Sequence, residues 1–345
     1  MTNTSNIWAE APNPNEGEFS AIARATHPDL IRQNFNVHHA TFITEDDIAA
    51  IAAAGLNTVR VPLGWWIPGF DDYDPSNQGD WKVYSAGTIQ YLDLLVNEWA
   101  LKYNVAVLLD VHAAKGSQNG KDHSSPSVPG KTLWDKDSSN VQNTIALVTF
   151  LVQRYKDQES FLGFGLLNEP DPDINKEVLY NYYQSVYKAV RDLGSDCVLA
   201  IAPVLTEQKP GFLTDFMVAP LYTNVKVDWH KYTLWGYDIV SDVDLVDVTI
   251  KQDIQNSIMQ WNAVPDHNAL YIGEWSLATT DRFKNDTELF YRFAEAYVTA
   301  VNQAAFGWTY WSWKKDWDHN TADMWSLRSV LRDERLKAIL LSANS

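Results

Sequence analysis

Residues 43–63, ITEDDIAAIAAAGLNTVRVPL, contain the pattern that decides the fold. Thr44 is a candidate N-cap, acidic residues follow it in the first turn and Gly55 ends the segment, so a helix is predicted over residues 43–56. The β-branched residues that come next predict a strand over residues 57–63. A helix followed at once by a short apolar strand is the repeating unit of a parallel α/β sheet.

The same unit recurs along the rest of the chain. Further strands are predicted at residues 104–112, 161–169, 197–202, 225–232, 269–275 and 305–313. Further helices are predicted at residues 87–103, 138–157, 175–193, 248–261, 286–302 and 329–341. Apolar strands that alternate with helices are typical of a parallel sheet covered on both sides. An eighth strand would lie before residue 40, where residues 5–10 and 19–23 are the candidates.

This pattern predicts a (β/α)8 TIM barrel, a single catalytic domain over residues 1–345. Residues 1–40 form its N-terminal segment, in which the first strand is irregular or poorly visible. The alternative is an open, doubly wound sheet. That fold favours a glycine-rich phosphate turn after its first strand, and the sequence has none there.

Composition limits the partners. The chain has 27 Lys and Arg against 44 Asp and Glu, a net charge of −17 that repels nucleic acid and anionic membranes. It has no apolar run of about 18 residues, and residues 1–20 lack the features of a secretory signal. We expect a monomer with no nucleic-acid or membrane partner.

The content of Cys and Trp is less decisive. The lone Cys197 fits either a reducing compartment or a secreted protein without disulfides. The 15 Trp fit either a sugar ligand or a large core.

Polar residues lie within or at the ends of five predicted strands, where a barrel builds its active site. Two of them, Glu169 and Glu274, are carboxylic acids of the kind that flank a scissile bond in glycoside hydrolysis. Asn168 is suited to hold a sugar hydroxyl, and Tyr232 or His230 to hydrogen-bond a carboxylate. The other polar residues at these strands are Arg60, Asp110, His112 and Asp228.

Six segments strengthen this hypothesis by their order and spacing. They are residues 56–66 (LNTVRVPLGWW), 108–125 (LLDVHAAKGSQNGKDHSS), 163–170 (GFGLLNEP), 227–232 (VDWHKY), 273–276 (GEWS) and 308–314 (WTYWSWK). Together they resemble glycoside hydrolase family 5, and within it the fungal-type exo-β-1,3-glucanase branch. The resemblance implies a (β/α)8 barrel and retention of configuration by double displacement, with no cofactor.

The resemblance also implies roles for individual residues. Glu169 matches the acid/base, Glu274 the nucleophile, and Trp311 the aromatic platform under the non-reducing sugar. The matching hydrogen-bonding set is Arg60, His112, Asn168, His230 and Tyr232. We expect no metal, because Asp110 and His112 lack the further ligands that a divalent ion needs.

Two departures from the family pattern concern substrate binding. The fungal enzymes carry an aromatic residue where this chain has Lys121, and that ring forms half of a clamp around the acceptor sugar. Trp235 matches the other half. Lys121 and Asp122, in the same loop, are expected to bind substrate. The family's first strand ends in Trp and Glu, for which only IWAEAP (7–12) remains, with Glu10 as the corresponding sugar contact.

The sequence therefore predicts a retaining β-glycosidase, with exo-β-1,3-glucanase activity that releases glucose from non-reducing ends. The alternatives are a family 5 β-glucosidase or diglycosidase that acts on small glycosides, and a sugar-binding protein without turnover. The family resemblance also implies an extracellular or cell-wall location.

Overall fold

The computed structural model describes residues 7–70, 79–85, 87–279, 282–315 and 323–342. It forms two units, an N-terminal unit over Met1–Thr206 and a C-terminal unit over Glu207–Ser345. A single catalytic domain over residues 1–345 stays a prediction.

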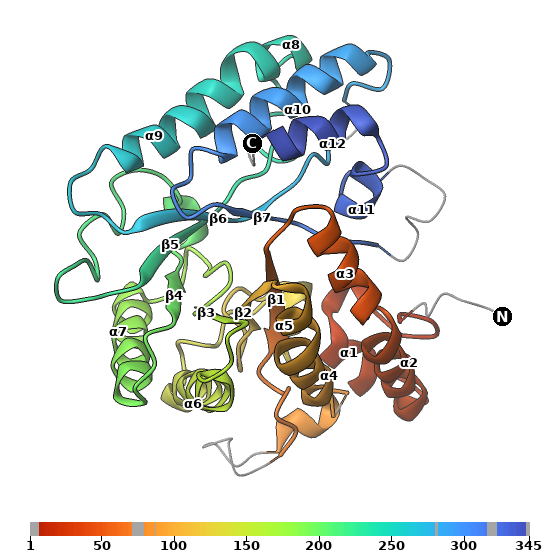
Figure 1. The fold of residues 1–345 in the computed structure, drawn as a ribbon. Coiled ribbons are helices and arrows are strands. Elements are labelled where there is room, and N and C mark those ends of the chain that lie inside the picture. The colour runs from red at the N-terminus through yellow and green to blue at the C-terminus, as the bar shows by residue number, and fades with distance from the viewer. Residues whose placement is uncertain (1–6, 71–78, 86, 280–281, 316–322, 343–345) are drawn as a thin grey trace. The chain divides into compact units, whose positions relative to one another are not determined.

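The N-terminal unit contains four parallel strands whose order in the sheet follows their order in the chain (Figure 1). The strands are β1 (Thr58–Gly64), β2 (Ala106–Ala113), β3 (Phe161–Gly165) and β4 (Val198–Ile201). The main helices are α1 (Glu18–Ala23), α2 (Pro28–Thr41), α3 (Glu45–Ala53), α4 (Ile89–Leu94), α5 (Ala100–Tyr103), α6 (Ser138–Tyr155) and α7 (Lys176–Asp192). A π-helical stretch, Leu95–Trp99, joins α4 to α5. All four strands predicted for this part of the sequence are confirmed.

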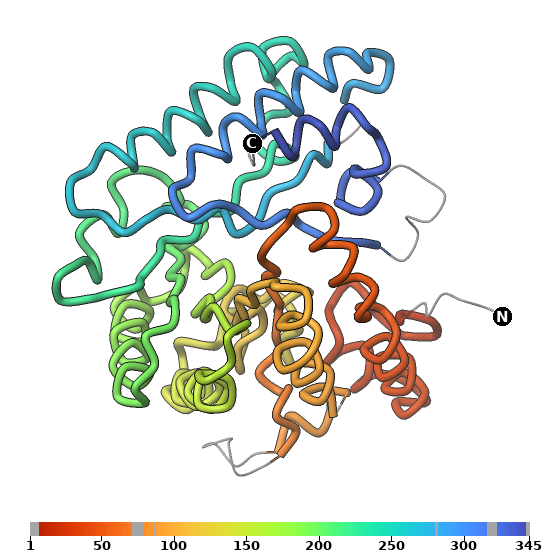
Figure 2. Tube along the Cα trace, viewed as in Figure 1, coloured from red at the N-terminus to blue at the C-terminus, as the bar shows by residue number. Residues whose placement is uncertain are grey.

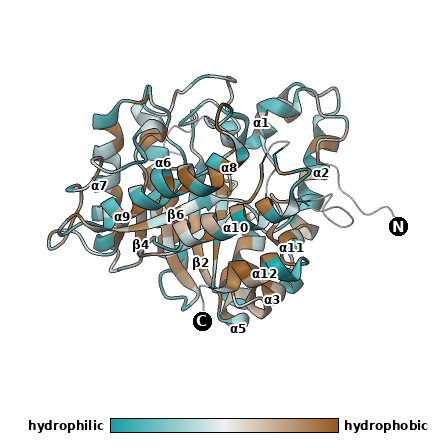
Figure 3. Cartoon of the chain, turned by 90° about the horizontal axis from the view of Figure 1, so that it is seen from above, coloured by the Kyte–Doolittle hydropathy of each residue, from teal (hydrophilic) through white to brown (hydrophobic). Residues whose placement is uncertain are grey.

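Caps and an amphipathic face explain where these helices form. Thr44 and Asp47 make a reciprocal capping box at the start of α3. Helix α7 buries Tyr182 and Tyr183 on one face, and their hydroxyls donate to the carbonyls of Leu166 and Ala202 at 2.7 and 2.8 Å. Buried tyrosine hydroxyls need hydrogen-bond partners, and these two find them in backbone carbonyls. The bonds fix α7 against the ends of β3 and β4. Figure 3 shows hydrophilic and hydrophobic patches alternating on α6 and α7.

The N-terminal segment differs from the prediction. The candidate strand at residues 19–23 is wrong, because these residues lie in α1. Residues 7–10, the described part of the other candidate, form a turn. The segment instead builds a small core from Ile22, Ile31 and Phe35, with the Trp8 ring 5.3 Å from that of Phe35. Apolar residues at helical spacing account for this outcome. The structure therefore shows seven strands among its described residues.

Helix α1 also carries a buried acid, Glu18. Its carboxylate accepts the backbone N–H of Ser85 at 2.7 Å. Burial away from water raises the pKa of Glu18 from 4.5 to about 7, against the opposing effect of that hydrogen bond. Because the folded-state pKa lies above the unfolded one, this group contributes stability below pH 4.5. That contribution is lost as the pH rises to about 7.

The Glu18→Gln variant tests this assignment. Relative to the wild type, it is expected to gain about 3 kcal/mol more in free energy of unfolding at pH 8 than at pH 4, because its amide carries no charge to bury. Urea unfolding at both pH values measures the difference. The exposed Glu98 serves as a control, and its Gln variant should show no such pH dependence. Equal effects of Glu18→Gln at both pH values would contradict the assignment.

The C-terminal unit contains three parallel strands, again in chain order (Figure 1). In Figure 2 the chain of this unit runs from green to blue. They are β5 (Val225–His230), β6 (Ala269–Trp275) and β7 (Trp308–Tyr310). The helices are α8 (Asp242–Asp244), a π-helical stretch (Leu245–Gln255), α9 (Asn256–Asn262), α10 (Thr287–Val301), α11 (Leu327–Val330) and α12 (Glu334–Leu341). The helix predicted over residues 329–341 is thus interrupted. Asp333 starts a new helix there, since its carboxylate accepts the N–H groups of Arg335 and Leu336.

Among the residues that the structure describes, no helix has the length and apolar character needed to cross a membrane.

Candidate functional site

A buried charge network links side chains of β1 and β2. Oδ2 of Asp110 lies 3.0 Å from Nη2 of Arg60 and 3.0 Å from Nδ1 of His112. The same Arg60 nitrogen donates to Oδ1 of Asn168 at 2.7 Å. The Arg60 and Asp110 side chains are only 3% and 2% exposed, so each charge depends on the other for compensation. This pairing with a guanidinium makes Asp110 a structural anion and a poor metal ligand.

The network orients the Asn168 side chain. Because Oδ1 accepts from Arg60, the amide group is fixed with Nδ2 on the other side. Nδ2 is buried and has no hydrogen-bond partner in the part of the chain that the structure describes. A buried donor of this kind is costly unless a ligand satisfies it. Asn168 is therefore suited to donate to a substrate hydroxyl.

Gly165 makes room for this network. It is the β3 neighbour of Asp110 in the sheet register, and a Cβ at this position would lie 2.6 Å from Oδ1 of Asp110. Any side chain there would displace the carboxylate that holds Arg60 and His112 in place.

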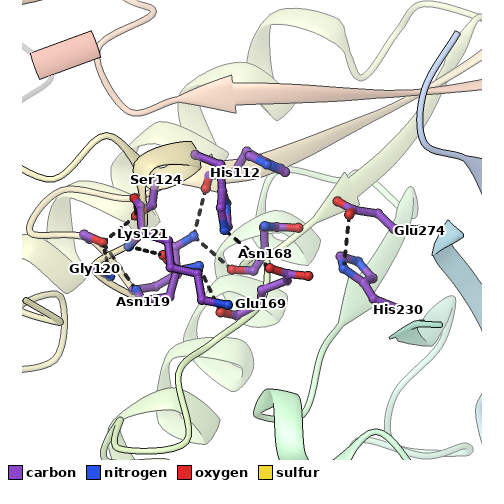
Figure 4. Close-up of polar contacts among 12 residues, drawn as sticks. His112, Asn119, Gly120, Lys121, Ser124, Asn168, Glu169, His230 and Glu274 are labelled. Atoms are coloured by element: carbon purple, nitrogen blue, oxygen red, sulfur yellow. Dashed lines mark hydrogen bonds and ion pairs between the residues drawn. The ribbon is translucent and has the colours of Figure 1, made fainter. Parts of the chain in front are cut away.

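Glu169 follows β3 in a left-handed backbone conformation, with φ of 44°. The loop after β2 holds this turn, as Figure 4 shows. The Gln118 amide donates to the carbonyls of His112 and Asn168 at 2.8 and 2.9 Å. The Asn119 amide donates to the carbonyl of Glu169 at 3.2 Å. The left-handed turn and these bonds fix the backbone from which the Glu169 carboxylate projects.

In the C-terminal unit, Glu274 lies on β6, with a side chain 7% exposed. The Tyr232 hydroxyl donates to its Oε2 at 2.9 Å. Nδ1 of His230 lies 3.5 Å from the same oxygen, the contact drawn in Figure 4. The backbone N–H of His230 donates to Oε1 of Gln208 at 2.7 Å. These contacts hold a buried carboxylate in one orientation, as a nucleophile requires.

Asp228 supports the side chain of His230 and the backbone beside Glu274. Its Oδ1 accepts the backbone N–H of Gly273 at 2.8 Å, and its Oδ2 lies 3.7 Å from Nε2 of His230. A Cβ at position 273 would lie 2.3 Å from Oδ1 of Asp228. Each unit thus places an aspartate against a strand glycine.

An aromatic surface in the C-terminal unit lies beside Tyr232. The exposed Trp235, with 65% of its surface accessible, has its ring 5.4 Å from that of Tyr232. Trp325 lies 5.6 Å from Tyr232 and 6.4 Å from Trp235. Trp325 also lines a cavity of about 360 Å³ together with Arg282. Sequence reasoning selected Trp235 but missed Trp325, which lies in no predicted strand or motif.

The remaining predicted residues are less closely placed. Trp311 follows β7, is partly buried, and donates its backbone N–H to the carbonyl of Trp275 at 2.9 Å. The side chains of Lys121 and Asp122 are exposed. The Lys121 backbone N–H donates to Oδ1 of Asn119 at 3.1 Å. Glu10 is exposed, in a turn with φ of 60°, and does not end a strand as the family pattern implies.

His123 is a further residue that sequence reasoning did not assign. Its Nε2 lies 3.5 Å from Oε2 of Glu169, and its ring lies 5.4 Å from that of His112. The motif that contains it, KDHSS, was quoted for the resemblance, but nothing in the pattern alone indicates a contact with Glu169.

Comparison with known proteins places the chain in a family. The model of the family described as Cellulase (glycosyl hydrolase family 5) matches residues 23–316. A glucan 1,3-beta-glucosidase of Schwanniomyces occidentalis is 28% identical over 347 residues, covering 88% of this chain and 75% of that protein. A probable glucan 1,3-beta-glucosidase A of Emericella nidulans is 32% identical, covering 71% of this chain and 56% of that protein. The chain thus spans little more than half the length of the second relative.

Solved structures agree on the fold. The rutinosidase from Aspergillus niger superposes with a TM-score of 0.75 at 19% identity, covering 96% of this chain and 92% of that one. The endoglucanase Cel5A from Thermotoga maritima has a TM-score of 0.58 at 19% identity, covering 86% and 90%. These likenesses and the alternation of parallel strands and helices confirm the predicted barrel fold class. The chain is a glycoside hydrolase and belongs to glycosyl hydrolase family 5.

Proposed function

We propose that this protein hydrolyses β-1,3-linked glucan from its non-reducing end and releases glucose with retained configuration. The observation that carries the chemistry is a pair of glutamates at barrel strand ends, Glu169 after β3 and Glu274 on β6, each held by its own set of hydrogen bonds. The substrate is supported by the relatives, which are named glucan 1,3-beta-glucosidases.

In the first proposed step, Glu274 attacks the anomeric carbon. A bond forms between its carboxylate oxygen and that carbon as the glycosidic C–O bond breaks. Glu169 gives its proton to the departing oxygen, so the leaving sugar departs as a neutral alcohol. The Tyr232 hydroxyl, 2.9 Å from Oε2 of Glu274, orients the nucleophile.

In the second step, the Glu169 carboxylate takes a proton from water. The oxygen of that water attacks the anomeric carbon and releases Glu274. Two inversions at one carbon give net retention. Asn168, fixed by Arg60, donates through Nδ2 to a sugar hydroxyl, and Trp311 supplies a face under the ring.

The leaving-group side of the site has one aromatic wall where the fungal enzymes have two. We place Trp235 on this side, with the exposed Lys121 in place of the second ring. A lysine hydrogen-bonds hydroxyls but offers no flat face, so the acceptor sugar is held less tightly than between two rings.

The Lys121→Phe variant is expected to lower KM for β-1,3-linked oligosaccharides by about fivefold, because a second face adds about 1 kcal/mol of contact. Trp235→Ala is expected to raise that KM to a similar extent. Neither change should alter KM for an aryl glucoside, which has no acceptor sugar to hold. Steady-state kinetics on both substrates test this. If both variants leave oligosaccharide kinetics unchanged, this loop does not form the acceptor site.

One product screen tests the proposed function as a whole. The protein is incubated with β-1,3-, β-1,4- and β-1,6-linked glucose oligosaccharides, and the products are identified by chromatography. Release of single glucose units, fastest from β-1,3 linkages, is the expected result. Preference for small glycosides would support the β-glucosidase or diglycosidase alternative, and binding without any release would support a sugar-binding protein.

The proposal extends to the setting of the enzyme. A monomer that acts on glucan outside the cell or in the cell wall is what the family resemblance implies. The net charge of −17 disfavours a nucleic-acid partner.

A further inference from the structure

His123 lies beside the proposed acid/base on a short 3-10 helix, Asp122–Ser124, in the loop after β2. Its Nε2 is 3.5 Å from Oε2 of Glu169. The two side chains are 30% and 15% exposed, so water screens their interaction only in part. At this distance, a protonated imidazole interacts directly with the carboxylate.

The loop fixes both members of this pair. Oγ of Ser124 lies 2.6 Å from Oγ of Ser117 and donates to the carbonyl of Lys121 at 2.8 Å, which anchors the short helix. The Asn119 amide, from the same loop, holds the carbonyl of Glu169. The distance between imidazole and carboxylate is therefore set by the loop.

The N-terminal segment secures the other end of the short helix. Oγ of Ser125 accepts the backbone N–H of Phe19 at 2.9 Å, and the carbonyl of Ser125 accepts the Tyr84 hydroxyl at 3.0 Å. A Cβ at Gly17 would lie 2.5 Å from the carbonyl oxygen of Asp122. These close contacts leave the His123 backbone little freedom to withdraw from Glu169.

The other charged groups around His123 are largely balanced. The ring of His112 packs edge-on against it, and Asp110 behind His112 is compensated by Arg60. Lys121 and Asp122, its neighbours in sequence, are exposed and of opposite charge. Within the N-terminal unit, Glu169 is thus the carboxylate that His123 contacts most directly.

We propose that His123 is a positioning residue that acts through Glu169: its protonated form favours the ionised carboxylate. This inference rests on the proposed function. An ionised Glu169 is the base of the second step, whereas a protonated Glu169 is the acid of the first. By favouring ionised Glu169, protonated His123 speeds the second step. It also lowers the fraction of Glu169 that is protonated, so the first step slows at a lower pH than it would without His123. The effect requires the protonated imidazole and is lost once the His123 ring is neutral.

The His123→Asn variant separates these two effects, because asparagine keeps a polar group but cannot carry a proton. With oligosaccharide, the alkaline limb of kcat/KM is expected to move to higher pH by about one unit, since Glu169 loses an adjacent positive charge. With a 2,4-dinitrophenyl glucoside, whose first step needs no acid, kcat at pH 5 is expected to fall several-fold, because less of Glu169 is ionised to act as base.

Two further variants complete the test. His123→Lys restores a cation and is expected to return the alkaline limb to the wild-type position or lower. Glu177→Gln, which removes an exposed charge from α7 of the same unit, should leave the limb near its wild-type position.

The proposal is overturned if His123→Asn lowers both activities equally and leaves the limb in place, as a structural residue would. It also falls if the limb moves to lower pH. The Glu169→Ala variant, measured in parallel, identifies a failure of the proposed function itself. If that variant hydrolyses oligosaccharide normally, Glu169 is not the acid/base, and the role of His123 fails with it.

Discussion

Replacing Glu274 by alanine is expected to lower kcat for oligosaccharide hydrolysis by about 10⁵- to 10⁶-fold, the scale on which enzymes lose activity with their nucleophile. The carboxylate that Tyr232 and His230 orient is then missing, and no neighbouring group replaces it. Azide fits the space left behind and attacks the anomeric carbon once. The expected product is a glucosyl azide of inverted configuration, identified by NMR.

A matched control for this variant is Glu295→Ala, which removes an exposed glutamate from α10 of the same unit. It should retain wild-type activity. If Glu274→Ala keeps activity within tenfold of the wild type, or if azide yields no inverted product, Glu274 is not the nucleophile.

Replacing Glu169 by alanine is expected to lower kcat/KM for oligosaccharides by about 10³-fold, the contribution of a positioned general acid. Activity on a 2,4-dinitrophenyl glucoside should persist in the first step, because that leaving group departs without protonation. The second step then lacks its base, so a glycosyl-enzyme intermediate accumulates. Rapid-mixing kinetics should show a burst of dinitrophenol, and azide should give a glucosyl azide of retained configuration.

The exposed Glu177, in the first turn of α7, is the corresponding control for the N-terminal unit. Its alanine variant should hydrolyse both substrates at the wild-type rate and give no azide product. An equal loss of activity by Glu169→Ala on both substrates, without a burst, would assign Glu169 a structural role.

Much of the fold is predictable because its signals are local. The Thr44 cap, the acids that follow it and Gly55 place α3, and a largely apolar run places β6 to the residue. A local sequence pattern does not predict the structure where it fits both a strand and a helix. Residues 19–23 are apolar and short enough for a strand, but their spacing continues into a helical core with Ile31 and Phe35.

Some residues of the candidate site could likewise be predicted from the sequence, and others could not. Residues at the ends of strands, such as Asn168 and Glu274, are found because the barrel topology brings strand ends to one face. His123 and Trp325 come from loops, and their contacts depend on how those loops fold back. The loop that places His123 is held by hydrogen bonds from Gln118 and Asn119 to backbone carbonyls, which no periodicity reveals. Tertiary contacts of this kind become visible only in the structure.

The proposed double displacement is tested most directly by trapping its covalent intermediate. The protein is incubated with 2,4-dinitrophenyl 2-deoxy-2-fluoro-β-glucoside, in which fluorine slows both steps and the good leaving group lets the first proceed. Mass spectrometry of the intact protein and of its peptides then locates the sugar. We predict one fluoroglucosyl group per chain, on Glu274. Absence of an adduct, or an adduct on Glu169 or any other residue, would contradict the account.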